Sequence, residues 1–170
     1  IGFMLEMRAS CRNRVQDYAD KFGVEFFPKQ KPWGVKADIM MPCATQNEVG
    51  MAEAEAMVKN GLKYYVEVAN MPTTNEAVAY LKANGVIVAP SKAVNAGGVA
   101  TSGLEMTQNS MRLGWSAKEV DEKLHYIMSS IHEQCVKYGK QADGYIDYVK
   151  GANVAGFMKV AHAMMAQGIV

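Results

Sequence analysis

The residues best suited to chemistry lie in one polar, glycine-rich stretch, PSKAVNAGGVATSG, at residues 90–103. This stretch holds an amide at Asn95, two adjacent glycines and several small hydroxyls, including that of Ser102. The run before it, residues 86–89, is uncharged and rich in β-branched side chains, which predicts a strand covered on both faces of a parallel sheet. Ligands of open α/β sheets bind beyond the carboxyl ends of such strands, so we expect residues 95–102 to face a ligand crevice.

Two further polar segments follow predicted strands in the same way, and we predict that all three segments are loops. They are PCATQNE, residues 42–48, and ANMPTTNEA, residues 69–77. If the strands are parallel, all three segments open toward one edge of the sheet. The amides and hydroxyls that then converge suit an amide-bearing ring, a ribose or a carboxylate, and they belong to Thr45, Gln46, Asn70, Asn95 and Ser102.

Other motifs of catalysis or metal binding are missing from the sequence. The Gly97-Gly98 pair lacks the G-x-G-x-x-G spacing of a pyrophosphate turn, and Leu104-Glu105 stands where a P-loop has Lys-Ser/Thr. The histidines are too far apart for a helical metal pair, and Lys92 fits an exposed lysine better than a Schiff-base nucleophile. We assign no catalytic and no metal-ligating residue, and a triad assembled only in space stays open.

The charge balance excludes an obvious polyanionic partner. Lysine and arginine number 18 against 17 aspartates and glutamates, so we expect neither nucleic acid nor a membrane as partner. A small basic group at residues 8–14 is flanked by Glu6 and Asp17, which favours a solvated helix face over a phosphate track. Three widely spaced cysteines and no long apolar run indicate reduced thiols in a cytoplasmic protein.

The elements that would position these segments follow from periodicity. Residues 4–22 predict one amphipathic helix ending at Gly23, and strands are predicted near residues 24–27, 38–41, 64–69 and 86–89. Beyond residue 103 the pattern becomes helical, including a final helix that opens at GANVAGF, residues 151–157. The chain is therefore an α/β protein with a partial doubly wound, mostly parallel sheet, helices on both faces and a helical carboxyl-terminal part.

Local signals mark the ends of the helices. Thr45, Thr73 and Ser116 each begin an S/T-x-x-E pattern, which predicts three capped helix starts. Asn60 and Asn84 each precede a glycine and a strand, so we interpret them as helix ends rather than hairpin turns. A capping role is preferred for Thr45, Thr73 and Asn84, whereas neither Asn70 nor Asn95 is needed as a cap.

In these segments the sequence resembles the glutamate dehydrogenases of the amino-acid dehydrogenase superfamily. PCATQNE, ANMPTTNEA, APSKAVNAGGVATSGLEM and GANVAGF look like that family's signature in the same order. The resemblance implies reversible oxidative deamination of L-glutamate to 2-oxoglutarate and ammonia, with hydride transfer to NAD or NADP, by a homo-oligomer that is a homohexamer. The choice between the cofactors stays open, because the strand that discriminates the ribose 2′ group lies at or before residue 1.

The resemblance also implies roles for particular residues. Asn95 would lie beside the nicotinamide, and Asn70 would contact the ribose side of the cofactor. The turn at Ala44, Thr45 and Gln46 would bind the cofactor as well. Ser102 and Val99 would help to bind the substrate side chain, and a hydroxyl suits a γ-carboxylate where an aliphatic residue would suit leucine or phenylalanine.

The same resemblance sets the expected extent of the chain. The family's glycine-rich pyrophosphate turn, catalytic lysine and catalytic aspartate belong to sequence before Ile1, so we expect a cofactor-domain fragment that is inactive alone. Residues 1–103 are interpreted as part of the dinucleotide-binding domain and residues 104–170 as its helical carboxyl-terminal part. The alternatives are a non-catalytic nucleotide-binding α/β regulatory module and a purely structural subunit.

Overall fold

The computed structural model describes residues 1–12 and 14–168. The chain forms two compact units, and the boundary between them in the sequence falls between Pro32 and Trp33. The first unit holds helices α1 (Gly2–Ala9) and α2 (Val15–Phe22). The prediction of one continuous helix is therefore wrong. The hydroxyl of Ser10 donates to the carbonyl of Met7 at 2.7 Å and Cys11 adopts φ 59°, and both features end α1.

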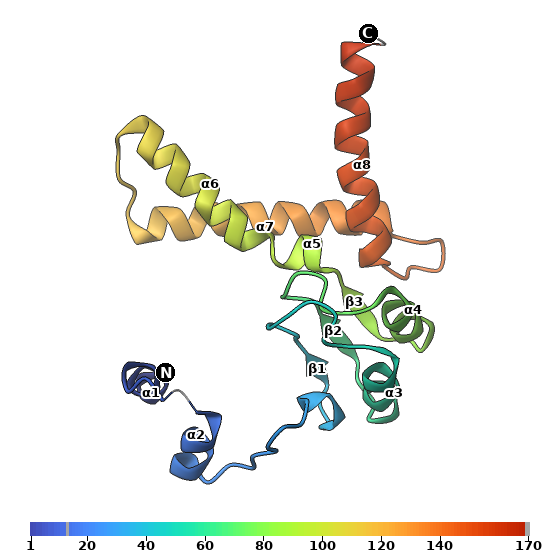
Figure 1. Ribbon diagram of the computed structural model, residues 1–170. Helices are drawn as coiled ribbons and strands as arrows, with labels where there is room; N and C mark the ends of the chain where they lie inside the picture. The colour runs from blue at the N-terminus through green and yellow to red at the C-terminus, as the bar shows by residue number, and fades with distance from the viewer. Residues whose placement is uncertain (13, 169–170) are drawn as a thin grey trace. The chain divides into compact units, whose positions relative to one another are not determined.

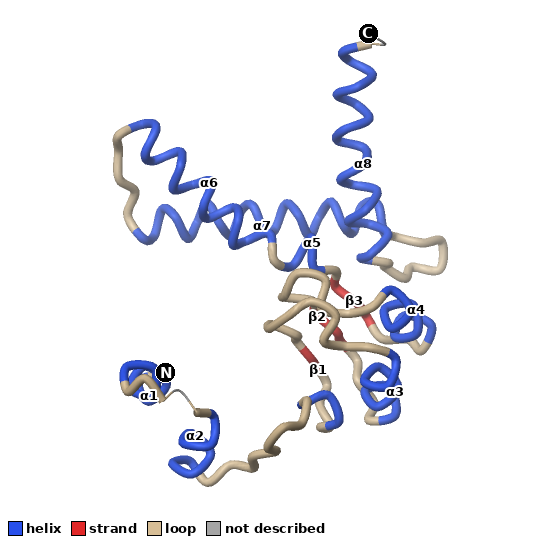
Figure 2. Tube along the Cα trace, in the orientation of Figure 1, coloured by secondary structure: helices blue, strands red, loops and turns tan. Residues whose placement is uncertain are grey.

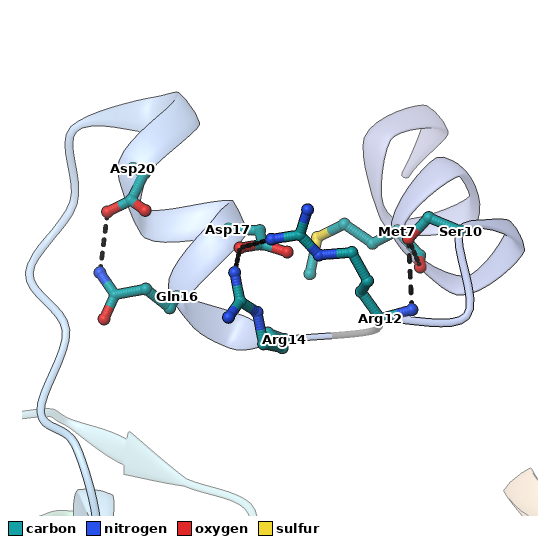
Figure 3. Close-up of polar contacts among 7 residues, drawn as sticks. All are labelled: Met7, Ser10, Arg12, Arg14, Gln16, Asp17 and Asp20. Carbon is teal, nitrogen blue, oxygen red and sulfur yellow. Dashed lines mark hydrogen bonds and ion pairs between the residues drawn. The ribbon is translucent and has the colours of Figure 1, made fainter.

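Aromatic rings and paired charges hold the first unit together. Phe3, Tyr18 and Phe22 form a ring cluster with centroids 4.5 to 6.2 Å apart. Figure 3 shows Arg12 and Arg14 both directed at Asp17, with N–O separations of 3.6 and 2.8 Å. Two of the arginines in the basic group are thus paired with a carboxylate.

The segment after α2 differs from the sequence expectation. α2 ends at Gly23, which takes φ 64° as predicted for a left-handed helix end. No strand forms over residues 24–27, so that prediction is wrong. A strand needs a hydrogen-bonding neighbour, and none pairs with this segment within the part of the chain that the structure describes.

The second unit is built on a parallel sheet of three short strands (Figures 1 and 2). In chain order these are β1 (Ile39–Met40), β2 (Tyr64–Val66) and β3 (Ile87–Ala89). The connections carry α3 (Met51–Lys59) and α4 (Asn75–Ala83), which lie side by side on one face of the sheet in Figure 1. This arrangement confirms the predicted α/β class.

The core lies between this face of the sheet and the two helices. Successive strand residues point to opposite faces, so Met40, Tyr65 and Val88 enter the core while Tyr64 and Ile87 do not. The helices and the segments beside them fill the core with Val49, Ala54, Met57, Leu62, Ala77, Leu81 and Val86. A 3₁₀ turn, η1 (Pro32–Gly34), adds Trp33. Burial of these side chains holds α3 and α4, the two helices that connect the parallel strands, against the sheet.

The opposite face of the sheet is only partly covered. A cavity of about 440 Å³ lies between Tyr64, Ile87 and the side chains of Met128 and Ile131. Tyr64 remains 45% exposed and Ile39 remains 54% exposed. Within the second unit, the apolar surface of this face is therefore incompletely buried.

Helix ends follow the sequence signals only in part. Asn60 and Asn84 end α3 and α4 as predicted, each followed by a glycine with φ near +80°. The predicted start at Thr45 is wrong, because α3 begins after Gly50, whose amide donates to Glu53 at 2.9 Å. α4 is capped by Thr74, one residue after the predicted Thr73.

The carboxyl-terminal half is helical. Its elements are α5 (Ser91–Val94), α6 (Ala96–Met111), α7 (Ala117–Gly139) and α8 (Tyr148–Gln167). Ser116 and Glu119 form the predicted capping box of α7. α8 begins three residues before the predicted Gly151, because Asp147 accepts a hydrogen bond from the Lys150 amide at 3.0 Å. Among the described residues no helix is long and apolar enough to cross a membrane.

The glycine-rich stretch at residues 90–103 is helical from Ser91 onward, and not the loop that the sequence predicted. Pro90 stands directly before the first helical turn, with an extended ψ of 148°. Residues 91–103 contain no proline that would interrupt a helix. Gly97 faces α7, where an added Cβ would lie 3.6 Å from the Met128 sulfur. The stretch is thus a packed pair of helices that starts where β3 ends.

Candidate functional site

Two loops at the carboxyl ends of β1 and β2 are joined by backbone hydrogen bonds. The carbonyl of Pro42 accepts from the amides of Val68 at 3.1 Å and Ala69 at 2.8 Å. Val49 and Thr73 form a parallel bridge further along the same loops. The segments at residues 42–49 and 67–74 therefore act as one layer at this edge of the sheet.

The third segment joins this edge through a pair of asparagines. The side-chain amide of Asn95 donates to the side-chain oxygen of Asn70 at 3.2 Å, across 25 positions of sequence. Asn95 ends α5 and precedes α6, while Asn70 follows β2. The structure thus brings together the two amides that the sequence analysis did not need as caps.

Val99 and Ser102 lie further along α6. They follow Asn95 by four and seven residues, so the three positions share one face of the helix. Both side chains are exposed, and the Ser102 hydroxyl donates to the carbonyl of Gly98 at 3.4 Å. Seven residues of helix correspond to about 10 Å, so Asn95 and Ser102 are separated by roughly that distance along α6.

The turn at residues 44–46 lies in the first of the two joined loops and is not bonded to the asparagine pair. Ala44, Thr45 and Gln46 are exposed, and the amide of Ala44 faces the Glu48 carboxylate at 3.4 Å. Among the described residues no hydrogen bond joins this turn to the side chain of Asn70. Its groups are available to a ligand that reaches across the layer.

Strained backbone marks the same edge. Asn47 and Met71 have φ of 52° and 44°, in the left-handed region that few residues other than glycine adopt. The Asn47 amide donates to the Met71 carbonyl at 3.0 Å, so the two strained residues support each other. Such strain clusters at ligand sites, and no sequence pattern singled out Met71 beyond its place beside Asn70.

Thr73 supports the edge from inside the sheet. Its hydroxyl lies 2.7 Å from the hydroxyl of Tyr65, a fully buried residue of β2. Burial raises the pKa of the Tyr65 hydroxyl above its ordinary value, so this phenol stays neutral. The threonine therefore anchors the loop after Asn70 to β2, in place of the capping role expected for it.

Glu67 is a residue of this edge that sequence reasoning missed. It is 6% exposed, and its carboxylate accepts a hydrogen bond from the amide of Ser91 at 3.1 Å. It also lines a cavity of about 470 Å³ together with Lys92 and Asn153, which bond to each other. A charged residue inside the otherwise apolar run YYVEVA is the signal that could have singled it out.

The neutral amide groups at this edge can form hydrogen bonds with a ligand. The Asn70–Asn95 bond occupies one donor and one acceptor, which leaves the Asn70 amide group and the Asn95 oxygen for a ligand. Within residues 1–12 and 14–168, no group of three metal-ligating side chains gathers. Fold and site thus define an α/β protein whose candidate ligand site lies at the carboxyl edge of an open parallel sheet.

Comparison with known proteins gives the family. The sequence model of the Glutamate/Leucine/Phenylalanine/Valine dehydrogenase family matches residues 1–168. The chain is 61% identical to an NAD-specific glutamate dehydrogenase of Clostridium symbiosum and 52% identical to an NADP-specific glutamate dehydrogenase of Escherichia coli. These alignments cover 99% and 98% of this chain, and 38% and 37% of the relatives.

Solved structures agree with the sequence comparison. One glutamate dehydrogenase superposes with a TM-score of 0.91 at 60% identity, over 99% of this chain and 38% of the other. A Plasmodium falciparum glutamate dehydrogenase gives 0.86 at 43% identity, over 95% and 35%. The chain belongs to the Glutamate/Leucine/Phenylalanine/Valine dehydrogenase family, and it spans about two fifths of the length of the curated relatives it matches.

Proposed function

We propose that this chain is the part of a glutamate dehydrogenase that holds the nicotinamide end of the cofactor and the side chain of the substrate. The observation that carries the proposal is the Asn70–Asn95 hydrogen bond at the carboxyl edge of the sheet. The identity to glutamate dehydrogenases over nearly the whole chain supports it. The parent enzyme would interconvert L-glutamate with 2-oxoglutarate and ammonia.

The asparagine pair binds and orients the cofactor. NAD or NADP, when bound, accepts the hydride that leaves the substrate. The oxygen of Asn95 accepts a hydrogen bond at the nicotinamide, and the amide group of Asn70 donates on the ribose side. The turn at Ala44, Thr45 and Gln46 completes the cofactor contacts, and relatives specific for either cofactor leave NAD and NADP both within the proposal.

Ser102 and Val99 select the substrate. They lie on the face of α6 that Asn95 begins, so a substrate held there meets the nicotinamide from one direction. The Ser102 hydroxyl donates to the γ-carboxylate of glutamate, a charge-assisted bond that an aliphatic substrate side chain cannot form. In the parent protein, which we place in the cytoplasm as a homo-oligomer, this contact favours glutamate over leucine and phenylalanine.

The test uses the full-length protein that carries this sequence. Ser102→Ala should lower kcat/KM for glutamate by about tenfold or more, because it removes a hydrogen bond to a charged group. Thr101→Ala is the matched control, since Thr101 is the neighbouring exposed hydroxyl on α6 and donates to its own helix at 2.9 Å. That control should stay within about twofold of the wild type.

Two results would contradict the proposal. A wild-type preference for branched or aromatic 2-oxo acids over 2-oxoglutarate would indicate another substrate class. Binding of the nucleotide without any turnover by the full-length protein would indicate a regulatory nucleotide-binding module.

A further inference from the structure

Within the described part of the chain, Glu67 is the one buried carboxylate at this edge of the sheet whose role the proposed function leaves unexplained. It follows β2 directly, and its amide donates to the carbonyl of Ala89 at the end of β3 at 3.0 Å. The backbone of Glu67 therefore extends the pairing of the two strands. Its side chain then continues from β2 toward the segment that begins beyond β3.

A short chain of hydrogen bonds runs from Glu67 to the asparagine pair. The carboxylate of Glu67 accepts from the amide of Ser91 at 3.1 Å. The carbonyl of Ser91 accepts from the amide of Asn95 at 2.9 Å, which closes the single turn of α5. The side chain of Asn95 then donates to Asn70 at 3.2 Å. One peptide turn thus separates the buried carboxylate from the proposed nicotinamide ligand.

Burial makes the first of these bonds strong. A carboxylate removed from water bonds a backbone amide more tightly than a neutral acceptor does, and leaving it unpaired is costly. Ser91 is the first residue of α5, so its amide has no acceptor inside the helix and can donate to Glu67. The orientation of the whole α5 turn is then fixed from β2.

We propose that Glu67 is a positioning residue for the cofactor, which holds α5 through the Ser91 amide so that Asn95 meets Asn70 at the nicotinamide. This inference rests on the proposed function, because it assigns Glu67 to the same cofactor site. In this role Glu67 acts through the Ser91 amide and needs no contact of its own with cofactor or substrate. Its loss loosens Asn95, and so it weakens recognition of the nicotinamide half of the cofactor while it leaves the adenosine half untouched.

The experiment compares two probes on the full-length protein. Glu67→Ala should weaken binding of the reduced cofactor by about tenfold, the cost of one charge-assisted hydrogen bond. Binding of ADP, or of its 2′-phosphate if the protein uses NADPH, should change less than twofold, because these probes lack the nicotinamide and its ribose. Glu67→Gln keeps an acceptor oxygen for the Ser91 amide and should restore most of the affinity.

Ser91→Pro removes the same bond from the other side. Proline has no amide proton, so it cannot donate to Glu67. The φ of a first helical residue is one that proline adopts readily. The extended ψ of Pro90 is compatible with a following proline. Ser91→Pro alone should weaken binding of the reduced cofactor about tenfold. The double variant Ser91→Pro with Glu67→Ala should bind the reduced cofactor about as well as Ser91→Pro alone. Non-additivity of this kind marks one shared interaction.

Several outcomes would overturn the inference. Equal losses for the reduced cofactor and for ADP would show a general folding defect, and unchanged binding in Glu67→Ala would show no role. A Glu67→Gln variant as weak as Glu67→Ala, or fully additive losses in the double variant, would contradict the hydrogen-bond route. If the wild type bound no reduced cofactor, the proposed function itself would fail, whereas the other outcomes leave it standing.

Discussion

Asp147 links three helices through its carboxylate and its backbone amide. Its side chain accepts from the ammonium of Lys82 on α4 at 2.8 Å and from the amide of Lys150 in the first turn of α8 at 3.0 Å. Its own amide donates to Gly139 at the end of α7 at 3.0 Å. Burial opposes ionisation of Asp147, but the bonds from Lys82 and Lys150 prevail and hold the pKa of this carboxyl below its ordinary value.

Asp147→Asn should lower the free energy of unfolding by about 1–2 kcal/mol at neutral pH. Asparagine can still cap α8, so the loss reports the pairing with Lys82. Asp38→Asn is the matched control, because the Lys63–Asp38 pair has a similar N–O distance of 2.9 Å but lies in solvent, and it should cause no measurable loss. Urea unfolding of the three proteins measures the difference, and equal effects of both substitutions would contradict the argument.

The contribution of Asp147 depends on pH with a definite sign. A pKa that is lowered in the folded state means that the unfolded chain binds more protons in acid. The stabilisation is therefore complete above the unfolded pKa, near 4, and is lost as the pH falls through the lower folded pKa. The stability gap between wild type and Asp147→Asn should close below about pH 4.

At the residue scale, the sequence predicted the asparagine pair but not its support. Asn70 and Asn95 follow strands and are not needed as caps, so their proximity follows from parallel strand order. The role of Glu67 depends on which amide lies opposite it, and that is set by the register of β2 against β3. The left-handed backbone of Met71 likewise depends on how two loops meet, which a single sequence does not encode locally.

Among the elements, the crossing of α7 and α8 depends on a close approach of backbones. An added Cβ on Gly151 would lie 2.0 Å from the carbonyl oxygen of Cys135 on α7. A second close approach occurs where Gly139 meets the backbone of Asp147. Two glycines therefore set how closely the helices pack, since larger residues would force the backbones apart.

Gly151→Ala should destabilise the second unit by at least about 3 kcal/mol, because a backbone atom cannot move away as a flexible side chain can. Gly156→Ala is the matched control on the same helix. Nothing lies within 4 Å of an added Cβ there, so alanine should stabilise α8 by up to about 1 kcal/mol through its helix propensity. Thermal unfolding of both variants measures the contrast, and a tolerated Gly151→Ala would show that α8 can shift freely.

Element boundaries show where local signals were sufficient. Ser116 with Glu119 and the Asn-Gly pairs were predicted correctly, because each motif satisfies its own backbone groups. The segment at residues 90–103 was mistaken for a loop because its glycines and small hydroxyls resemble turn residues. Packing of Gly97 against α7 supports the helix there, and that contact joins residues far apart in sequence.

At the scale of the whole molecule, the chain spans 38% of the length of its Clostridium symbiosum relative. The lysine and aspartate that the resemblance assigns to acid–base catalysis were not among the residues identified in the sequence analysis. The described edge offers amides, hydroxyls and a buried carboxylate that is already bonded. Under the proposed function this arrangement would bind and orient the ligands, and the proton transfers of deamination would need further groups.

The polypeptide of 170 residues is therefore expected to show no glutamate-dependent reduction of NAD or NADP. The full-length protein at the same concentration is the control, and circular dichroism of the short polypeptide establishes that it is folded. Turnover by the folded short polypeptide would contradict both the assignment of the missing groups and the recognition role proposed for this edge.

The fold class was predictable because its signals are distributed over the whole chain. Apolar strands alternating with helical periods required a parallel sheet, and the structure has one. The separation of the chain near Pro32 was not predicted, because the amphipathic pattern at residues 4–22 gives the period of a helix but not what it packs against. The predicted division at residue 103 stays a prediction.

The incompletely covered face of the sheet has a thermodynamic consequence. Ile39 and Tyr64 already contact water in the folded second unit, so unfolding hydrates less new hydrocarbon than a fully enclosed sheet would. Because the heat-capacity increment of unfolding scales with that newly hydrated area, the stability curve of this unit is flatter than its length alone would give. Whatever covers Ile39 and Tyr64 would steepen that curve as well as raise it.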